Sequence, residues 1–111
     1  MIAGVVASQI TAAPAPVTAT PSIESVYCID DGMGNRYVYA DIKNNDASSV
    51  TIYSSGISKG TWTAGQTKAF IVANIPGAPY DYDLSITAQA SGESLSLPAT
   101  QSGTVSFCIS M

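Results

Sequence analysis

From Ile23 to the end of the chain, apolar and polar residues alternate with a period of two. In the stretch 37–42, valine, alanine and isoleucine alternate with tyrosine and aspartate, and the stretch 82–89 alternates in a similar way. Such alternation places apolar side chains on one face of a strand and polar side chains on the other, as in a half-buried sheet. The pattern therefore predicts an all-β fold.

Turn sequences divide this region into short strands. The runs 44–46 (Asn-Asn-Asp) and 91–92 (Ser-Gly) are typical of turns, and the run 76–79 contains two prolines that break a strand. The strands that we expect lie within residues 23–29, 37–42, 50–53, 61–63, 68–73, 82–89, 94–97 and 104–109, with Pro98 ending the seventh. Six to eight short strands at spacings of about ten residues indicate a β-sandwich.

The first 22 residues have a different character, because no charged residue precedes Glu24. Residues 1–13 are small and apolar, and residues 14–22 form a linker that contains three prolines. Such a linker is expected to be extended and polyproline-like, and it cannot continue a helix. We therefore divide the chain into an apolar tail with its linker, 1–22, and a sandwich domain, 23–111.

Cys28 and Cys108 are the only cysteines, and they lie near the two ends of the predicted sandwich. Both neighbourhoods read as strands, and their wide spacing is unlike the close Cys-x-x-Cys spacing of a metal or redox site. We predict that they form a disulfide, which would place the protein in an oxidising compartment outside the cytosol. The alternative is a pair of buried, reduced thiols.

The composition restricts the partners of the chain. Charged residues make up 11% of it, while 15 serines and 10 threonines supply a neutral, hydroxyl-rich surface that favours association. The net charge is −4, and the basic residues are scattered, which argues against nucleic-acid binding. No apolar run reaches the ~20 residues that a membrane span requires. The four basic residues are Arg36, Lys43, Lys59 and Lys68.

Two runs, Ala40–Tyr53 and Gly60–Val72, resemble the immunoglobulin-like domains of archaeal surface-filament proteins, including archaeal pilins and archaellins. In those proteins a strand ending in Asn-rich turn residues is followed by a Val-Thr-Ile-Tyr strand, and then by a Gly-Gln-Thr turn before an apolar strand. The resemblance implies an immunoglobulin-like sandwich in an extracellular filament. Pilins begin with a long, unbroken hydrophobic helix, whereas here the apolar stretch has only 13 residues and is followed by Pro14 and Pro16.

The short apolar tail suits another mode of assembly, donor-strand complementation, in which an extended peptide adds a strand to the sheet of a neighbour. Read with a period of two, one face of the tail carries Ile2, Val6 and Ile10, and a helical period adds Val5 to them. We predict that these four residues lie at a subunit interface. The alternatives are a helical oligomerisation segment, a remnant signal sequence, a disordered terminus, or a strand folded back onto its own domain.

The chain contains few residues of the kinds that catalyse reactions, and we expect neither enzymatic activity nor a bound metal or cofactor. It contains no histidine, so the usual general base and zinc ligand are missing. Oxygen ligands for Ca²⁺ could come from the run 28–35 or from the run 80–83, but the first lacks the closing glutamate of an EF-hand and is more simply a hairpin turn. Asp81 and Asp83 share one face of a strand, so paired-carboxylate hydrolysis is a further alternative.

Tyr37 and Tyr39 alternate with core positions and should lie together on the outer face of their strand. We predict that they form a subunit contact, since an exposed aromatic patch is typical of an interface. The alternatives are ordinary cross-strand surface pairs and a platform for sugar rings. Trp62, by contrast, is expected to pack in the core beside Phe70.

These observations favour a structural, non-enzymatic subunit of an extracellular filament, such as a pilus or adhesion fibre, that polymerises through its N-terminal segment. Its partners would be copies of itself, with a surface receptor or a neighbouring filament as a further possibility. The alternative hypotheses are a monomeric cell-surface module that binds carbohydrate or protein, and a virion coat or fibre protein.

Overall fold

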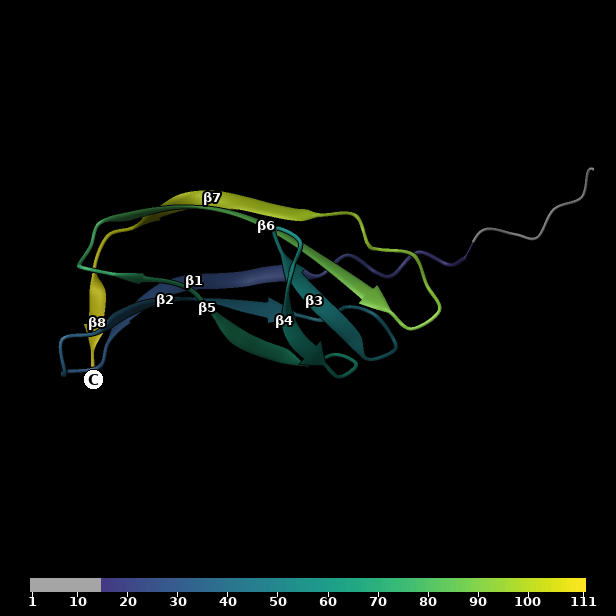
Figure 1. The fold of residues 1–111 in the computed structure, drawn as a ribbon, viewed down its shortest axis with the longest axis horizontal. Coiled ribbons are helices and arrows are strands. Elements are labelled where there is room, and N and C mark those ends of the chain that lie inside the picture. The colour runs from purple at the N-terminus through teal and green to yellow at the C-terminus, as the bar shows by residue number, and fades with distance from the viewer. Residues whose placement is uncertain (1–14) are drawn as a thin grey trace, which may run out of the picture.

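A computed structural model describes residues 15–111, which form an all-β fold of eight strands in two sheets (Figure 1). The alternating pattern had predicted an all-β sandwich of six to eight short strands. The strands are β1 (Ser22–Asp30), β2 (Arg36–Lys43), β3 (Val50–Ser54), β4 (Ile57–Trp62), β5 (Thr67–Ile75), β6 (Tyr80–Ala90), β7 (Ala99–Val105) and β8 (Cys108–Ser110).

Each sheet has four strands. The first sheet has the order β5-β2-β1-β8, and the second has the order β4-β3-β6-β7. All neighbouring strands are antiparallel except β1 and β8, which run parallel. The chain changes sheets between β7 and β8, at Ser106 and Phe107, so that the last strand joins the sheet that contains the first.

The core lies between the two sheets and is built from the inward positions of the alternating strands. Trp62 is its largest fully buried side chain, and it packs in one cluster with Phe70, as the sequence predicts. The indole Nε1 of Trp62 donates a hydrogen bond of 2.9 Å to the carbonyl of Ile42, so its only polar atom is satisfied inside the core.

The predicted turn at residues 44–46 is held by a buried amide. The Asn44 side chain is 1% exposed; its Nδ2 donates to the carbonyls of Ser48 and Thr63 at 2.8 and 3.0 Å, and its Oδ1 accepts from the Asp46 amide at 2.8 Å. Each bond replaces one that the loop backbone would otherwise make to water. The turn is thus part of the packed end of the sandwich.

One predicted strand is wrong. Residues 94–97 form only an isolated bridge at Ser94, and β7 begins after Pro98. The buried Ser96 explains why: its Oγ accepts from the amide of Ala88, and its own amide donates to the Ala88 carbonyl. Side-chain bonding of this kind competes with a regular ladder. The predicted strand 104–109 is likewise divided, between the end of β7 and β8.

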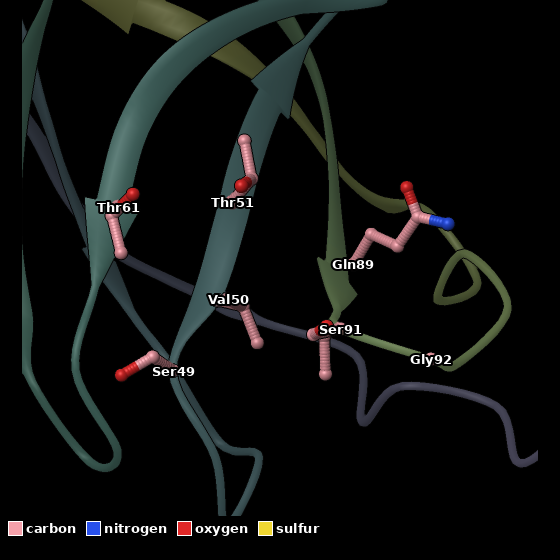
Figure 2. A pocket seen from close by; sticks show the side chains of 8 residues that line it. Ser49, Val50, Thr51, Thr61, Gln89, Ser91 and Gly92 are labelled. Atoms are coloured by element: carbon pink, nitrogen blue, oxygen red, sulfur yellow. The ribbon is translucent and has the colours of Figure 1, made fainter.

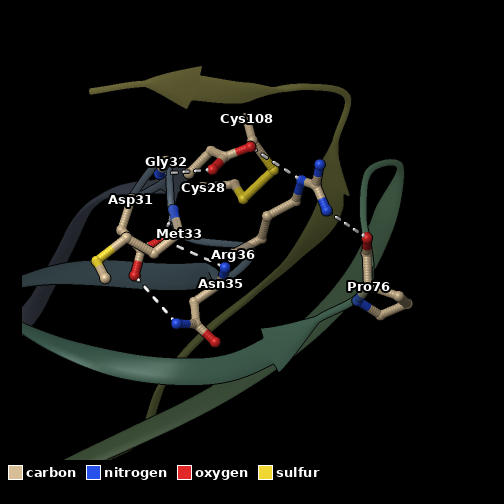
Figure 3. Close-up of polar contacts among 9 residues, drawn as sticks. Cys28, Asp31, Gly32, Met33, Asn35, Arg36, Pro76 and Cys108 are labelled. Carbon is tan, nitrogen blue, oxygen red and sulfur yellow. Dashed lines mark hydrogen bonds and ion pairs between the residues drawn. A yellow bond between two sulfur atoms is a disulfide. The ribbon is translucent and has the colours of Figure 1, made fainter.

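The predicted disulfide joins the first strand to the last. Cys28 and Cys108 are direct partners in the register of β1 and β8, with a Cα–Cα distance of 4.5 Å (Figure 3). The bond closes a long loop, because the two residues are 80 positions apart. Cys28 is almost completely buried and belongs to a second, smaller apolar cluster with Val38, Ile75 and Val105.

Removing this disulfide should lower the free energy of unfolding substantially. For two cysteines that are 80 positions apart, the chain-entropy model gives about 4–5 kcal/mol. We expect the double variant Cys28→Ala/Cys108→Ala to lose most of that amount in urea denaturation. Intact mass after alkylation without reduction should show no modified thiol in the native protein. Two alkylated cysteines, or a variant as stable as the native chain, would contradict this account.

Candidate functional site

The outer face of the first sheet carries a patch of large apolar side chains, which we call the tyrosine–isoleucine face. Strand pairing places its members side by side across four strands, since Tyr27 pairs with Tyr39, Tyr39 with Ile71, and Ile29 with both Tyr37 and Ile109. The face comprises Tyr27, Ile29, Tyr37, Tyr39, Ile71 and Ile109. Sequence reasoning had predicted only Tyr37 and Tyr39, because the other members join them through strand pairing.

The tyrosines of this face form an ordered row. The rings of Tyr27 and Tyr39 are stacked with centroids 5.7 Å apart, and Tyr37 lies tilted against Tyr39 at 6.5 Å. Asp41 fixes one end of the row, since its carboxylate accepts hydrogen bonds from the hydroxyls of Tyr27 (3.1 Å) and Ser25 (2.7 Å). Partial burial, together with the neighbouring Asp41 carboxylate, raises the pKa of Tyr27.

Much of the face remains open to solvent. Ile71 is 48% and Ile109 49% exposed, while the three tyrosines and Ile29 are half-buried. An outward sheet face in a soluble protein is usually polar, and a contiguous apolar patch marks an interaction surface. The sequence predicted a contact at Tyr37 and Tyr39; the structure places both on this patch, and the identity of their partner stays a prediction.

The linker approaches the domain from one end of the sandwich, and the C-terminus lies at the opposite end (Figure 1). The last residues of the linker form hydrogen bonds with the domain to which the linker belongs. The Thr18 amide donates to the Ser94 carbonyl (3.0 Å), the Ser94 amide donates to the Pro16 carbonyl (2.8 Å), and the Thr18 hydroxyl accepts from the Ala90 amide (2.9 Å). The sequence predicted an extended linker and gave no sign that its stretch 15–21 is anchored on the domain. The predicted interface residues Ile2, Val5, Val6 and Ile10 lie outside the described residues.

An apolar groove of about 210 Å³ was not anticipated from the sequence. It lies where β8 leaves β7 to join β1, and Phe107, 69% exposed, lies in its wall. The signal that could have found it is the run Val105–Ile109, where apolar residues stop alternating regularly. Its lining residues are Val26, Tyr27, Cys28, Thr104, Val105, Ser106, Phe107 and Ile109.

The acidic run after Cys28 forms a hairpin turn between β1 and β2 (Figure 3), as the simpler of the two sequence interpretations predicts. Asp30 Oδ1 accepts from the Gly32 amide at 2.9 Å, and Asp31 Oδ1 accepts from the amides of Met33 (2.8 Å) and Asn35 (3.2 Å). The Met33 amide, followed by the Asn35 side chain and amide, lowers the pKa of Asp31. The carboxylates of Asp30 and Asp31 therefore accept hydrogen bonds within the turn.

The second acidic run lies on the surface of the second sheet. Asp81 and Asp83 are exposed on the outer face of β6, and Asp81 Oδ1 accepts from the Thr104 hydroxyl at 2.7 Å. Neither residue lines the groove at Phe107 or the hollow described next.

A shallow hollow of about 340 Å³ lies at one end of the second sheet, over β3, β4 and the end of β6. Figure 2 shows hydroxyl and amide side chains around it, contributed by Ser49, Thr51, Thr61, Gln89 and Ser91. None of its lining residues is aromatic. The hollow therefore lacks the ring face on which a sugar would stack.

Within residues 15–111, no group of three or more acidic or cysteine side chains is placed to hold a metal ion. The same part of the chain includes no helix of the length and hydropathy needed to cross a bilayer. Comparison of the chain with protein-family models, with curated proteins and with solved structures found no match in any of the three.

The raised pKa of Tyr27 predicts a pH dependence of stability. A group whose pKa is higher in the folded state stabilises fully below its unfolded pKa, about 10 for tyrosine, and this stabilisation is lost as the pH rises through the folded value. We therefore expect the stability difference between the native protein and Tyr27→Phe to shrink above about pH 10. Urea denaturation at neutral and alkaline pH measures it; a difference that stays constant would contradict the raised pKa of Tyr27.

Proposed function

We propose that this protein is a structural subunit of an extracellular filament, a pilus or adhesion fibre of the archaeal type, with an immunoglobulin-like sandwich as its repeating body. The subunits would be joined through the N-terminal segment by donor-strand complementation. The observation that carries the proposal is the tyrosine–isoleucine face, a contiguous apolar surface on the outside of an otherwise ordinary sheet.

The face suits a packed contact better than the binding of a small ligand. It is a row of side chains on a sheet. Of the two hollows described above, one lies elsewhere and the other touches the face only at Tyr27 and Ile109. Tyrosine is enriched at protein interfaces, because its ring adds apolar area while its hydroxyl still reaches a polar partner. Only 11% of the residues are charged, so electrostatic repulsion between the surfaces of identical copies is weak.

The disulfide supports an extracellular location. Disulfides persist in oxidising compartments and are rare where cellular thiols are kept reduced. The bond between Cys28 and Cys108 is therefore compatible with a protein exposed at the cell surface. It also suits a durable fibre, because it closes the long loop that contains most of the domain.

Electron microscopy of the purified full-length protein tests the proposal directly. We expect regular fibres whose repeat matches one sandwich domain. Dispersed particles at all concentrations would contradict it and favour the alternative, a monomeric surface module. Closed shells, or fibres capped by a distinct particle, would instead favour a virion protein.

Loss of the aromatic row should impair assembly more than folding. Tyr37→Ser/Tyr39→Ser removes two aromatic pairs, worth about 0.5–1.5 kcal/mol each, so the domain should remain folded at room temperature. We expect the critical concentration for fibre formation, measured by sedimentation, to rise by about tenfold or more. Tyr53→Ser, on the outer face of the second sheet, is the matched control and should assemble normally. Normal assembly of the double variant would remove these tyrosines from the interface.

A further inference from the structure

One edge of the first sheet is only partly closed. Strand β1 pairs with β2 along its whole length, but on its other side it pairs with β8 only at residues 28–30. Along 22–27 no strand of the described chain pairs with that side. A strand edge of this kind presents unpaired amide and carbonyl groups and acts as a template for a further strand.

The groove at Phe107 lies directly beside this open edge. Val26 and Tyr27 of the open stretch line it from one side, and Val105 and Phe107 line it from the other. The side chains of Val26 and Val105 also belong to the smaller apolar cluster around the disulfide. A strand added to β1 at this edge would therefore gain backbone partners on its edge and an apolar surface for every second side chain.

Two lysine side chains cover the opposite side of the sandwich, between β4 and β5. Lys68 Nζ lies 4.3 Å from the centre of the Trp62 ring, and Lys59 Nζ lies 5.5 Å from that of Phe70. Charged side chains, lysine above all, are a common protection of sheet edges against further pairing. None of the groove-lining residues is charged. The one charged residue of the open stretch, Glu24, does not line the groove and is exposed at a register shift between Ile23 and Ser25. The groove end of the open edge thus lacks the lysine cover of the opposite side.

We propose that the open edge of β1, residues 22–27, together with the groove at Phe107, is the acceptor site for residues 1–13 of a second copy of this chain. The inference rests on the proposed function and adds to it the surface on which the N-terminal segment binds. It assigns a role to Phe107, which neither the core nor the tyrosine–isoleucine face explains.

The length of the N-terminal segment fits this site. At about 3.3 Å per residue, the six-residue open edge is about 20 Å long, and thirteen extended residues cover about 43 Å. Half of the segment can therefore form the added strand, while the rest spans the distance to its own domain. The segment carries no charge, and a period of two gives it Ile2, Val6 and Ile10 as a row for an apolar groove.

The anchored linker favours a second copy over the segment's own domain. To pair with its own β1, the chain would have to reverse within the few residues before Ser22, as in a hairpin. Those residues, 15–21, are held against Ser94 and Ala90 at the end of the second sheet instead. A donor segment and an acceptor edge are also two different surfaces, so their contact is heterologous and can repeat from one subunit to the next, as a filament requires.

Photo-cross-linking tests the site within the assembled fibre. A photoreactive phenylalanine analogue at position 107 is introduced into full-length protein, which is co-assembled with an equal amount of isotopically heavy native protein. We expect cross-links to residues 1–13 that join a light chain to a heavy one. The same analogue at position 57, an exposed isoleucine of β4 on the lysine-covered side, is the control and should not reach this segment.

Cross-links from position 107 that stay within one chain, or that reach a different part of the neighbour, would overturn the acceptor site. If the fibres form normally in that case, the proposed function is unaffected. If the native protein forms no fibres at all, the proposed function fails and the acceptor site fails with it.

A pair of matched substitutions supplies a second measurement. Phe107→Lys places a lysine beside the open edge, and lysine protects sheet edges against pairing with a further strand. It should raise the critical concentration for assembly by about tenfold or more. Ile57→Lys, at a similarly exposed position, should leave it unchanged. Val6→Asp should block assembly, because it would bury an unpaired charge. Equal behaviour of the two lysine variants, each folded by circular dichroism, would overturn the proposal, as would unimpaired fibres of Val6→Asp.

Discussion

The bond between Cys28 and Cys108 determines where the first sheet is closed and where it is open. Strand β8 has only three residues, and a ladder of that length contributes little by itself. The disulfide fixes β8 beside the end of β1, directs the crossing from the second sheet through Phe107, and brings Ile109 onto the outer face beside Ile29. The groove at Phe107, and Ile109 on the tyrosine–isoleucine face, therefore depend on this covalent link.

The two surfaces have complementary roles in the proposed fibre. Burial of a few aliphatic side chains in the groove contributes about 1.5–3 kcal/mol each, and the added backbone bonds contribute about 0.5–1.5 kcal/mol each. Ordering roughly ten residues of the N-terminal segment costs about 1–2 kcal/mol per residue, which nearly cancels that gain. A strand contact alone would thus be weak. The tyrosine–isoleucine face offers a second contact, already ordered by ring stacking and by Asp41, and two linked contacts together are far stronger than either.

Local sequence signals predicted what depends on local chemistry. Alternation identified the inward positions of β2 and β6, the Asn-rich turn was found at Asn44, and the tryptophan was assigned to the core. The cysteine pairing followed from two strand-like neighbourhoods. What escaped prediction depends on pairing between distant segments. Ser94–Leu97 has the pattern of a strand, yet it forms no regular ladder, and the Ser96 hydroxyl accepts a hydrogen bond from the Ala88 amide of β6 instead. Ile71 and Ile109 join the tyrosines only through strand register, and the groove exists only because the chain changes sheets at Phe107.

The central claim is that each subunit completes the first sheet of a neighbour with its N-terminal segment. The most direct measurement is a structure of the native fibre by cryo-electron microscopy, at a resolution that traces the backbone. The account predicts a ninth strand beside residues 22–27 of β1, continuous with residue 14 of another subunit and with an apolar side chain against Phe107. An edge of β1 left open, with residues 1–13 gathered into a helical bundle along the fibre axis or folded onto their own domain, would contradict it.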